Sequence, residues 1–260
     1  DAELRQAGAV MPEAAGFERP GFFIKPGEPK TFGYSYGPQG WDQACKREAL
    51  NTHENVTLFD HSCFAKFMVE GPDATAVLNR ICANNIDVGL GRLVYTQWLN
   101  DKGGIEADVT VTRLTETSYL IVTIASSQTR DMAWLKGHIP HDARAFAYDA
   151  TSGLPMLALM GPRARDLLQS LSGADLSSQA HPFGTSQMIE IGYATVRASR
   201  ITFVGELGWE LYMPAEMAAH VFERLVEAGA DYGLKHGGFF AINSLRMEKG
   251  YRHWGHDIGV

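Results

Sequence analysis

The chain has 260 residues, of which 45% are hydrophobic and 20% are charged, as is usual for a globular protein with a sizeable core. A net charge of -7 makes nucleic acid and anionic membranes poor partners, and no apolar run reaches the roughly 18 residues that a membrane helix needs. The first residues do not resemble a signal peptide, and three scattered cysteines without a C-x-x-C pair argue against disulfides or a zinc site. We therefore expect a protein of a reducing compartment, the cytoplasm or, in a eukaryote, the mitochondrial matrix.

Residues 1–55 are predicted to form a connector and N-terminal segment. Between residues 16 and 41 this segment is rich in glycine, proline and aromatic residues, which is typical of an extended chain that lies on a surface. A short helix is expected over 41–50. The aromatic side chains expected to hold the segment in place are Phe22, Phe23, Tyr34, Tyr36 and Trp41.

The rest of the chain contains an internal similarity. Gly71-Pro72 and Gly161-Pro162 each follow an alternating apolar strand and precede a helix, with the proline expected at the first helical position. A strand over 119–124 and a helix over 126–138 likewise match a strand over 209–213 and a helix over 214–229. We therefore predict an α+β protein with two similar units, 56–150 and 151–260, each an antiparallel sheet backed by helices. Chance similarity remains an alternative, because strand–helix units commonly begin with Gly-Pro.

A hairpin turn is predicted at Asn100-Asp-Lys-Gly-Gly. On the outgoing strand, Glu106 and Asp108 share one face, and apolar residues occupy the other. The pattern alone permits two interpretations of Asp108, a solvated edge charge or a carboxylate directed into a cleft.

Two later charged residues are also candidates. Glu210 enters an apolar strand between Trp209 and Leu211, where a carboxylate faces water or binds a ring that offers adjacent N–H donors, as a pterin does. Arg246 lies on a helix predicted to end at Gly250, and it is a surface charge or a partner of Glu248.

Other polar clusters are weaker candidates. His253-Trp-Gly-His256 lacks a third ligand at a defined spacing, so we expect no bound metal. Asp60-His61-Ser62 and Cys63 could suggest a nucleophile, but a single cysteine without a paired base is more often buried structure. No glycine-rich dinucleotide-binding turn and no Walker motif occur.

Several blocks together resemble the folate-binding part of the sarcosine and dimethylglycine dehydrogenases, which are relatives of the aminomethyltransferase (T-protein) of glycine cleavage. The blocks follow the family's order, and they are Gly16-Phe-Glu-Arg-Pro, Gly103-Gly-Ile, Gly161-Pro162, residues 203–209 and residues 248–254. The resemblance implies a T-protein type of fold whose terminal β-barrel is not present in this chain. It also implies that FAD binds only to a separate flavin domain, present in cis or as a partner.

The resemblance assigns roles to four residues. Asp108 matches the aspartate credited with catalysis, and Glu210 matches the glutamate that holds the pterin of folate. Phe203 stands where many relatives have tyrosine, so stacking is retained and a hydroxyl is lost. Arg246 matches an arginine that lines the folate cavity. T-proteins usually have histidine where this chain has Cys63, which weakens any catalytic use of that position.

The expected function is therefore capture of a one-carbon unit on tetrahydrofolate. The unit is the methylene of an iminium formed by oxidation of an N-methyl amine such as sarcosine or dimethylglycine, and the product is 5,10-methylenetetrahydrofolate. Two alternatives stay open. One is a folate-binding module without catalysis, and the other is a free-standing aminomethyltransferase, against which the Gly-Phe-Glu-Arg-Pro connector argues.

Overall fold

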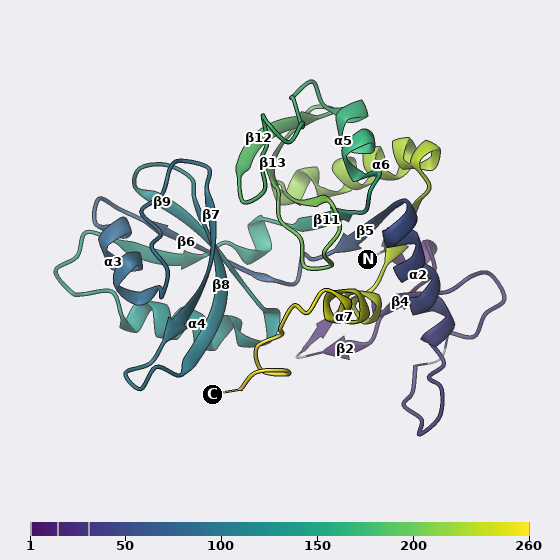
Figure 1. Cartoon of the computed structure of the whole chain (residues 1–260), viewed down its shortest axis with the longest axis horizontal. Coiled ribbons are helices and arrows are strands. Elements are labelled where there is room, and N and C mark those ends of the chain that lie inside the picture. Colours follow the sequence, from purple (N-terminus) through teal and green to yellow (C-terminus); the bar gives the residue numbers. More distant parts are fainter. Residues whose placement is uncertain (1, 15, 31, 260) are drawn as a thin grey trace.

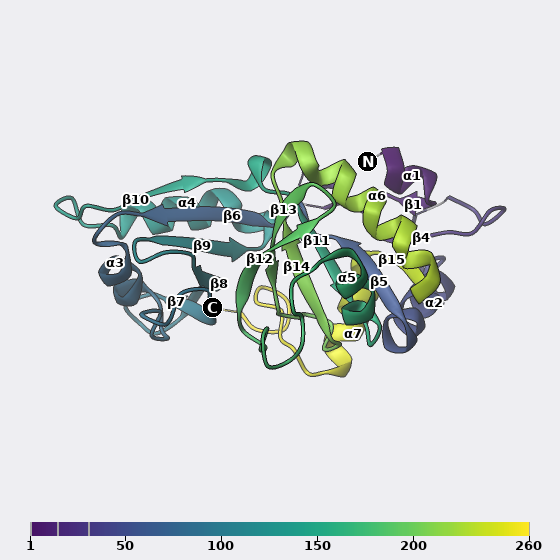
Figure 2. The ribbon, with the colours of Figure 1, turned by 90° about the horizontal axis from the view of Figure 1, so that it is seen from above.

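The structure, a computed structural model, describes residues 2–14, 16–30 and 32–259. Two sheets with helices on one face of each lie next to one another along the long axis of the molecule (Figures 1 and 2). Neighbouring strands run antiparallel in both sheets with one exception. The predicted α+β architecture of antiparallel sheets backed by helices is confirmed.

The first sheet has five strands and is built from one continuous stretch of chain. Its helix-covered face carries a core in which Phe67, Trp98 and Tyr119 are completely buried. The helices on that face are α3 (Ala74–Ile81) and α4 (Gln128–Gly137). In spatial order the strands are β10 (Phe146–Asp149), β6 (Ala65–Glu70), β9 (Ser118–Thr123), β8 (Ile105–Arg113) and β7 (Leu93–Leu99).

The second sheet has six strands, and helices α5 (Ala164–Leu171) and α6 (Ala218–Gly229) cover one face of it. Their apolar sides pack with Trp209 and Leu211 in a second core. In spatial order the strands are β12 (Ser186–Ile191), β13 (Ala194–Ser199), β14 (Gly208–Tyr212), β11 (Met156–Met160), β5 (Val56–Asp60) and β15 (Leu234–Gly237). Only the outermost pair, β5 and β15, is parallel.

The two sheets repeat one topology with one insertion. In the first sheet β10 lies directly beside β6, whereas in the second sheet β5 lies between β11 and β15. Strand β5 comes before the whole first sheet in the chain and yet pairs with both of these later strands. The sheets therefore divide the chain differently from the ranges 56–150 and 151–260, because the strand that begins the first range belongs to the second sheet.

The two Gly-Pro turns are the clearest sign of the repeat. Gly71 and Gly161 adopt nearly the same unusual backbone angle, with φ of 132° and 136°. A side chain on Gly71 would overlap the carbonyl oxygen of Arg144, and one on Gly161 would overlap that of Asn55. Both positions therefore require glycine for the same reason, a close approach of the strand that lies beside the turn. The prolines lie in the turns before the helices and not, as predicted, at the first helical position.

The N-terminal segment packs beside the second sheet. Phe22 is almost completely buried, with its ring centroid 6.2 Å from that of Trp41 and 6.0 Å from that of Phe240. Tyr36 is fully exposed, so its predicted packing is wrong. Tyr34 is largely exposed and makes edge contacts with Phe32 and Trp41. The elements of this segment are α1 (Ala2–Gln6), β1 (Ala9–Val10), β2 (Glu13–Ala14), β3 (Phe17–Glu18), β4 (Phe22–Phe23) and α2 (Asp42–Glu54), the last longer than the predicted helix.

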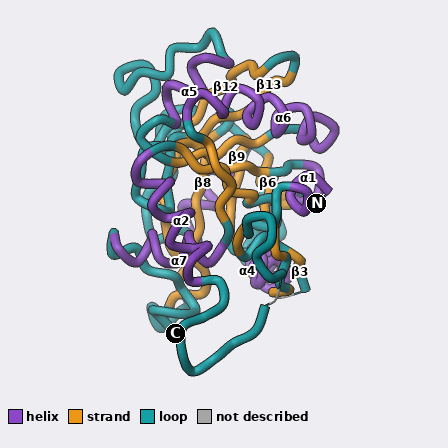
Figure 3. Tube along the Cα trace, turned by 90° about the vertical axis from the view of Figure 1, so that its right-hand side faces the viewer, coloured by secondary structure: helices purple, strands orange, loops and turns teal. Residues whose placement is uncertain are grey.

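Helix α7 (Phe239–Glu248) lies beside α2 (Figures 1 and 3). After Gly250, whose φ is 72°, the chain turns away and runs toward the first sheet (Figure 1). There the guanidinium of Arg130 from α4 lies 5.0 Å from the ring centroid of Trp254. The last residues thus connect the two sheets. Within the described ranges, every helix is too short or too polar to traverse a membrane.

Candidate functional site

Strand β8 presents two carboxylates on the face that its helices leave open. Ala107 and Val109 are about 1% exposed and pack in the core beneath α3 and α4. Side chains alternate across a strand, so Glu106 and Asp108 lie on the opposite face, as predicted. Both are partly accessible to solvent.

Asp108 is held by a tyrosine. The hydroxyl of Tyr95, on the neighbouring strand β7, donates a hydrogen bond of 2.9 Å to Oδ2 of Asp108. Burial raises the pKa of Asp108, and this hydrogen bond works against the rise. Within the described ranges, no cationic side chain forms an ion pair with Asp108. Its negative charge is therefore partly desolvated and not neutralised.

Glu106 differs from Asp108 in this respect. Its carboxylate accepts hydrogen bonds from Asn100 and from the guanidinium of Arg130. The two contacts lower the pKa of Glu106 and fix its charge in a local network that also reaches Trp254. Of the two carboxylates, Asp108 is the one left free to act on a ligand.

Glu210 projects from the open face of the second sheet. Its neighbours Trp209 and Leu211 are completely buried on the other face. Oε2 of Glu210 accepts a hydrogen bond of 2.6 Å from the hydroxyl of Tyr212. Burial raises the pKa of Glu210, while the tyrosine hydroxyl and the nearby ammonium of Lys66 oppose the rise. The side chain keeps partial exposure, so Glu210 is neither a plain solvated charge nor a sealed core residue.

The two carboxylate-bearing faces are turned toward each other. Four side chains of a small apolar cluster pack between the sheets, and they are Leu120, Val122, Met156 and Tyr212. Val122 pairs across the sheet with Thr110, which is two residues after Asp108 and on the same face. Tyr212 is the residue that binds Glu210. Glu210 therefore adjoins this cluster directly through Tyr212, and Asp108 lies on the same face of β8 as Thr110, one alternation earlier along the strand.

Phe203 and Arg246 both contact the C-terminal segment 251–257. The ring of Phe203 lies 6.3 Å from that of Tyr251 in a stacked arrangement. Arg246 is 3% exposed and donates hydrogen bonds to the side chain of Asn243, the carbonyl of Tyr251 and the carboxylate of Asp257. The surface-charge interpretation of Arg246 is therefore wrong. So is the pairing with Glu248, which instead lies 2.9 Å from Nε2 of His53.

The remaining sequence candidates show no catalytic geometry. Burial raises the pKa of the Cys63 thiol, which disfavours the thiolate that a nucleophile needs. The rings of His253 and His256 lie 4.2 Å apart. In the part of the chain that the structure describes, no group of three or more histidine, cysteine or acidic side chains is arranged to hold a metal ion.

Three residues near the site were not found from the sequence. Tyr212 could have been predicted, because it lies two positions after Glu210 and so shares the same face of the strand. Tyr95 had a weaker one, since the predicted hairpin brings β7 beside β8 but leaves the register open. Lys66 had none, because a lysine in a strand is expected at the surface, and this side chain is completely buried.

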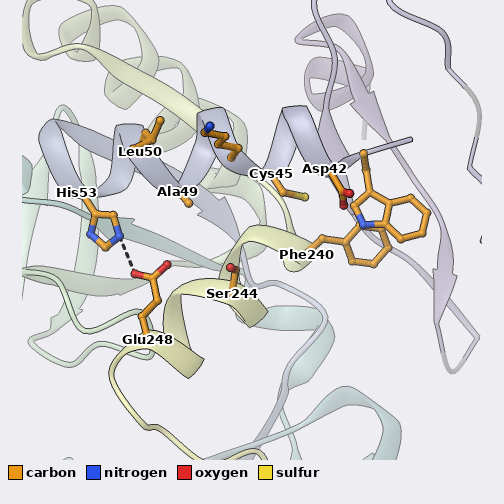
Figure 4. Close-up of a pocket in the computed structure, with 10 residues that line it drawn as sticks. Asp42, Cys45, Ala49, Leu50, His53, Phe240, Ser244 and Glu248 are labelled. Atoms are coloured by element: carbon orange, nitrogen blue, oxygen red, sulfur yellow. Dashed lines mark hydrogen bonds and ion pairs between the residues drawn. The ribbon is translucent and has the colours of Figure 1, made fainter. Parts of the chain in front are cut away.

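A surface groove lies elsewhere. It has a volume of about 420 Å³ and runs between α2 and α7 (Figure 4). Its lining includes Cys45, His53 and Glu248, and none of the four predicted site residues. Burial raises the pKa of the Cys45 thiol to about 12, so this thiol is not reactive at neutral pH.

Comparison with known proteins identifies the family. The family model described as the GCVT N-terminal domain matches residues 1–260. The 4-methylaminobutanoate oxidase (formaldehyde-forming) of Paenarthrobacter nicotinovorans is 43% identical over 258 residues, which are 99% of this chain and 31% of that protein. The mitochondrial sarcosine dehydrogenase of Mus musculus is 34% identical over 299 residues, 98% of this chain and 32% of that protein.

Another relative is named as a regulatory subunit and not as an enzyme. The mitochondrial pyruvate dehydrogenase phosphatase regulatory subunit of Mus musculus is 35% identical over 267 residues, 99% of this chain and 30% of that protein. This chain thus spans about a third of the length of each of these three relatives.

A solved structure supports the same assignment. The glycine cleavage system aminomethyltransferase T from Bartonella henselae superimposes with a TM-score of 0.81 at 25% identity, covering 99% of this chain and 63% of that one. The predicted resemblance to T-protein and to sarcosine and dimethylglycine dehydrogenases is thereby confirmed. The chain belongs to the GCVT aminomethyltransferase family.

Proposed function

We propose that this chain binds tetrahydrofolate and transfers to it the methylene group of an iminium derived from an N-methyl amine. The observation that carries the proposal is the partly desolvated carboxylate of Asp108, which has no cationic partner among the described residues. A fixed negative charge of this kind stabilises a cationic electrophile in its transition state. The family assignment supports the same class of reaction.

The reaction balances without an added oxidant. The methylene carbon of the iminium ion leaves its nitrogen and forms two new bonds, one to N5 and one to N10 of tetrahydrofolate. The products are 5,10-methylenetetrahydrofolate and the demethylated amine in its protonated, ammonium form, so both folate N–H protons end on the departing amine. Tetrahydrofolate, when bound, supplies the two nucleophilic amines. Asp108 supplies the negative charge and a carboxylate oxygen that passes a proton toward the amine, and the Tyr95 hydroxyl orients it.

The residues of the second sheet fit the pterin. Oε2 of Glu210 already accepts one hydrogen bond from Tyr212, and Oε1 has no partner within the described ranges. A carboxylate that is partly exposed and half satisfied suits the paired N–H donors of an aminopyrimidinone edge. Phe203 offers an apolar ring for the flat pterin to pack on. Arg246 is fully engaged, so we assign it an indirect part, holding segment 251–257 against Phe203.

Replacing Asp108 with asparagine tests the proposal. We expect Asp108→Asn to bind tetrahydrofolate about as well as the unchanged protein and to capture the methylene group about 10²–10⁴ times more slowly, as is typical when a general acid–base or charge-stabilising group is lost. The measurements are a calorimetric titration with tetrahydrofolate and a rate of methylenetetrahydrofolate formation from formaldehyde and a secondary amine.

Glu106→Gln is the matched control. The carboxylate of Glu106 lies on the same face of β8 as that of Asp108, but Arg130 already neutralises it. The control variant should keep the normal rate. Normal capture by Asp108→Asn would disprove the assignment.

The relative with a regulatory name favours one alternative, a module that binds folate without transferring a one-carbon unit. The same two measurements, together with an assay that uses an aminomethyl-lipoyl donor, separate the functions. Tight folate binding by the unchanged protein with no methylenetetrahydrofolate formed would establish the binding module. If methylenetetrahydrofolate formed from an aminomethyl-lipoyl donor and not from the iminium, the chain would catalyse the reaction of a free-standing aminomethyltransferase.

A further inference from the structure

The backbones of the two sheets are joined at one corner of the molecule. Arg92, directly before β7, forms an antiparallel bridge with Thr185, directly before β12. A hydrogen bond flanks the bridge on either side. In each, the N–H of the first residue donates to the carbonyl of the second, and the two are Leu93 to Gly184 at 2.9 Å and Ser186 to Gly91 at 2.7 Å. We call these two segments, 91–93 and 184–186, the joint.

The joint continues into both sheets. On the first side, the N–H of Gly91 donates to the carbonyl of Arg113 at the end of β8, at 2.7 Å, and the N–H of Arg113 donates to that of Arg92, at 3.0 Å. On the second side, the N–H of Arg200, which directly follows β13, donates to the carbonyl of Thr185 at 2.8 Å. A ladder of backbone hydrogen bonds therefore runs from the end of β8 through the joint to the end of β13.

The joint lies at the edge of the first sheet that is opposite to the chain crossings. The chain passes from β5 to β6 and later from β10 back to β11, and β6 and β10 are neighbours at one edge of the first sheet. Strand β7, which begins in the joint, is the other edge. A sheet attached along one edge can pivot, whereas a sheet attached along both edges keeps one angle to its neighbour.

The joint requires glycine at position 91. Gly91 has a φ of 74°, and a Cβ there would lie 2.6 Å from the carbonyl oxygen of Ser186. That oxygen belongs to the backbone of the facing segment, so rotation of a side chain does not relieve the overlap, and a larger residue forces the segments apart. Gly184 has a similar φ of 76°, but a Cβ there would meet nothing closer than 3.9 Å. The close approach is therefore a property of Gly91.

A buried histidine holds the second-sheet half of the joint. His181 is 1% exposed. The indole N–H of Trp209 can only donate, so Nδ1 of His181 accepts it at 3.2 Å. Nε2 of His181 then carries the proton and donates it to the carbonyl of Thr185, also at 3.2 Å. Since Trp209 directly precedes Glu210 on β14, these contacts tie the joint to the strand that carries Glu210.

Both carboxylates of the proposed site lie on strands that are in register with the joint or end in it. Ser186 pairs with Ser199, and Ser199 pairs with Glu210, so the three side chains form one row across the open face of the second sheet. The hydroxyl of Ser199 donates a hydrogen bond of 3.0 Å to that of Ser186. On the first sheet, Asp108 lies on β8 and its partner Tyr95 lies on β7, the two strands whose ends form the other half of the joint.

We propose that Gly91 is a positioning residue for the one-carbon transfer. It lets the backbone of the first sheet join that of the second, and the joint fixes the sheet that carries Asp108 against the sheet that carries Glu210. Glu210 then holds the pterin of a folate whose reacting nitrogens lie at Asp108. The inference rests on the proposed function and adds to it the requirement that the two sheets keep one spacing.

The first arm of the test needs no folate. In Gly91→Ala the overlap with Ser186 opens the joint, so the amides of Leu93 and Ser186 should exchange with deuterium about ten to a hundred times faster in the full-length protein. NMR resolves the exchange residue by residue, and the amide of Ile121, inside the first sheet, should exchange as before. Gly27→Ala is the matched control, because Gly27 has a φ of 89° and a methyl group there meets nothing within 4 Å.

Gly91→Asn keeps the proposal falsifiable if the alanine variant does not fold. Asparagine adopts a positive φ more readily than alanine, but its Cβ takes the same place, 2.6 Å from the carbonyl oxygen of Ser186. It should therefore also open the joint. Exchange at Leu93 and Ser186 as slow as in the unchanged protein, in whichever of the two variants folds, would overturn the inference.

The second arm separates positioning from general damage. A tetrahydropterin without the side chain of folate binds through Glu210 and Phe203 on the second sheet, so Gly91→Ala should bind it about as tightly as the unchanged protein does. The kcat of methylene capture, divided by the number of pterin-binding sites, should fall about 10–100-fold with a much smaller change in KM, because a small misplacement of reacting groups is costly. A protein that is merely less stable would have fewer pterin-binding sites and a normal rate at each.

The outcomes distinguish the two claims. If the joint opens in Gly91→Ala and the rate at each site is normal, the positioning inference fails and the proposed function stands. If the unchanged protein binds no tetrahydrofolate and forms no methylenetetrahydrofolate, the proposed function fails, and the positioning role fails with it.

Discussion

His61 shows how a single residue makes the stability of this fold depend on pH. The imidazole is 3% exposed, lies among the rings of Phe59, Phe64 and Phe239, and has no hydrogen-bond partner for either nitrogen within the described ranges. Burial, reinforced by the positive charge of Lys66, lowers its pKa to about 3 from 6.5. The ring is therefore neutral in the folded protein at any pH near neutrality.

The unfolded chain takes up a proton at His61 near pH 6.5, and the folded chain does not until about pH 3. The contribution of His61 to stability is thus complete above pH 6.5 and falls by about 1.4 kcal/mol per pH unit below it. Between pH 6.5 and pH 5 we expect the free energy of unfolding to drop by about 2 kcal/mol from this residue. His61→Phe should remove that part of the slope in urea denaturation. His141→Gln, which changes an exposed histidine, should leave the slope as it is. Parallel curves for His61→Phe and the unchanged protein would refute the expectation.

For single residues, the sequence predicts the side chains that stand out in a local strand pattern. It does not predict the burial of side chains whose surroundings come from distant segments. Asp108 and Glu210 lie in alternating strands, where the pattern left a solvated charge and a site carboxylate both open, and the resemblance to the T-protein family singled them out. The burial of Lys66 and Arg246 could not be predicted, since it depends on a facing sheet for one and on segment 251–257 for the other.

Among the elements, the turn after β11 tests whether the repeat has a common physical basis. Gly161 has a φ of 136°, and a methyl group there would overlap the carbonyl oxygen of Asn55. We expect Gly161→Ala to lower the free energy of unfolding by about 1–3 kcal/mol, the usual cost of a strained backbone conformation. Gly71→Ala should cost a similar amount because the geometry at Arg144 is the same.

Gly153→Ala is the control, since a methyl group at Gly153 meets nothing within 4 Å and its φ is not positive. Its effect should stay within about 0.5 kcal/mol, as for most surface changes. If Gly161→Ala proved as mild as the control, the requirement for glycine at these turns would be wrong.

Most elements could be predicted because strands and helices carry their own periodicity. Helices α4 and α6 and strands β9 and β14 lie close to their expected ranges, and α3 and α5 follow the two Gly-Pro turns as predicted. The neighbours of β5 could not be predicted in this way. Periodicity identifies Val56–Asp60 as a strand and contains nothing about its partners β11 and β15, which lie about a hundred residues or more further along the chain.

Across the whole molecule, one carboxylate joins the N-terminal segment to the second sheet. Glu48 of α2 is 4% exposed and accepts hydrogen bonds from the backbone N–H groups of Phe23, at 2.6 Å, and of Gly238, at 2.8 Å. Burial raises its pKa to about 7. Glu48→Ala would leave both N–H groups without an acceptor in the interior.

We expect Glu48→Ala to lower the free energy of unfolding by about 2–4 kcal/mol, since each buried unsatisfied group costs about 1–3 kcal/mol and removal of the buried carboxylate recovers part of the loss. Urea denaturation measures the change. Glu54→Ala, an exposed glutamate on the same helix, should have almost no effect. Equal stabilities of the two variants would show that the N-terminal segment is held mainly by its aromatic packing around Phe22 and Trp41.

The position of β5 has a consequence for how the chain can be divided. The five-stranded sheet is a continuous excursion that leaves the six-stranded sheet after Asp60 and returns to it at Met156. Excising that excursion removes the whole five-stranded sheet, whereas cutting the chain in front of it takes away the strand that joins β11 to β15. During synthesis, β5 therefore leaves the ribosome long before either neighbour exists, and the six-stranded sheet closes only after the five-stranded one has been made.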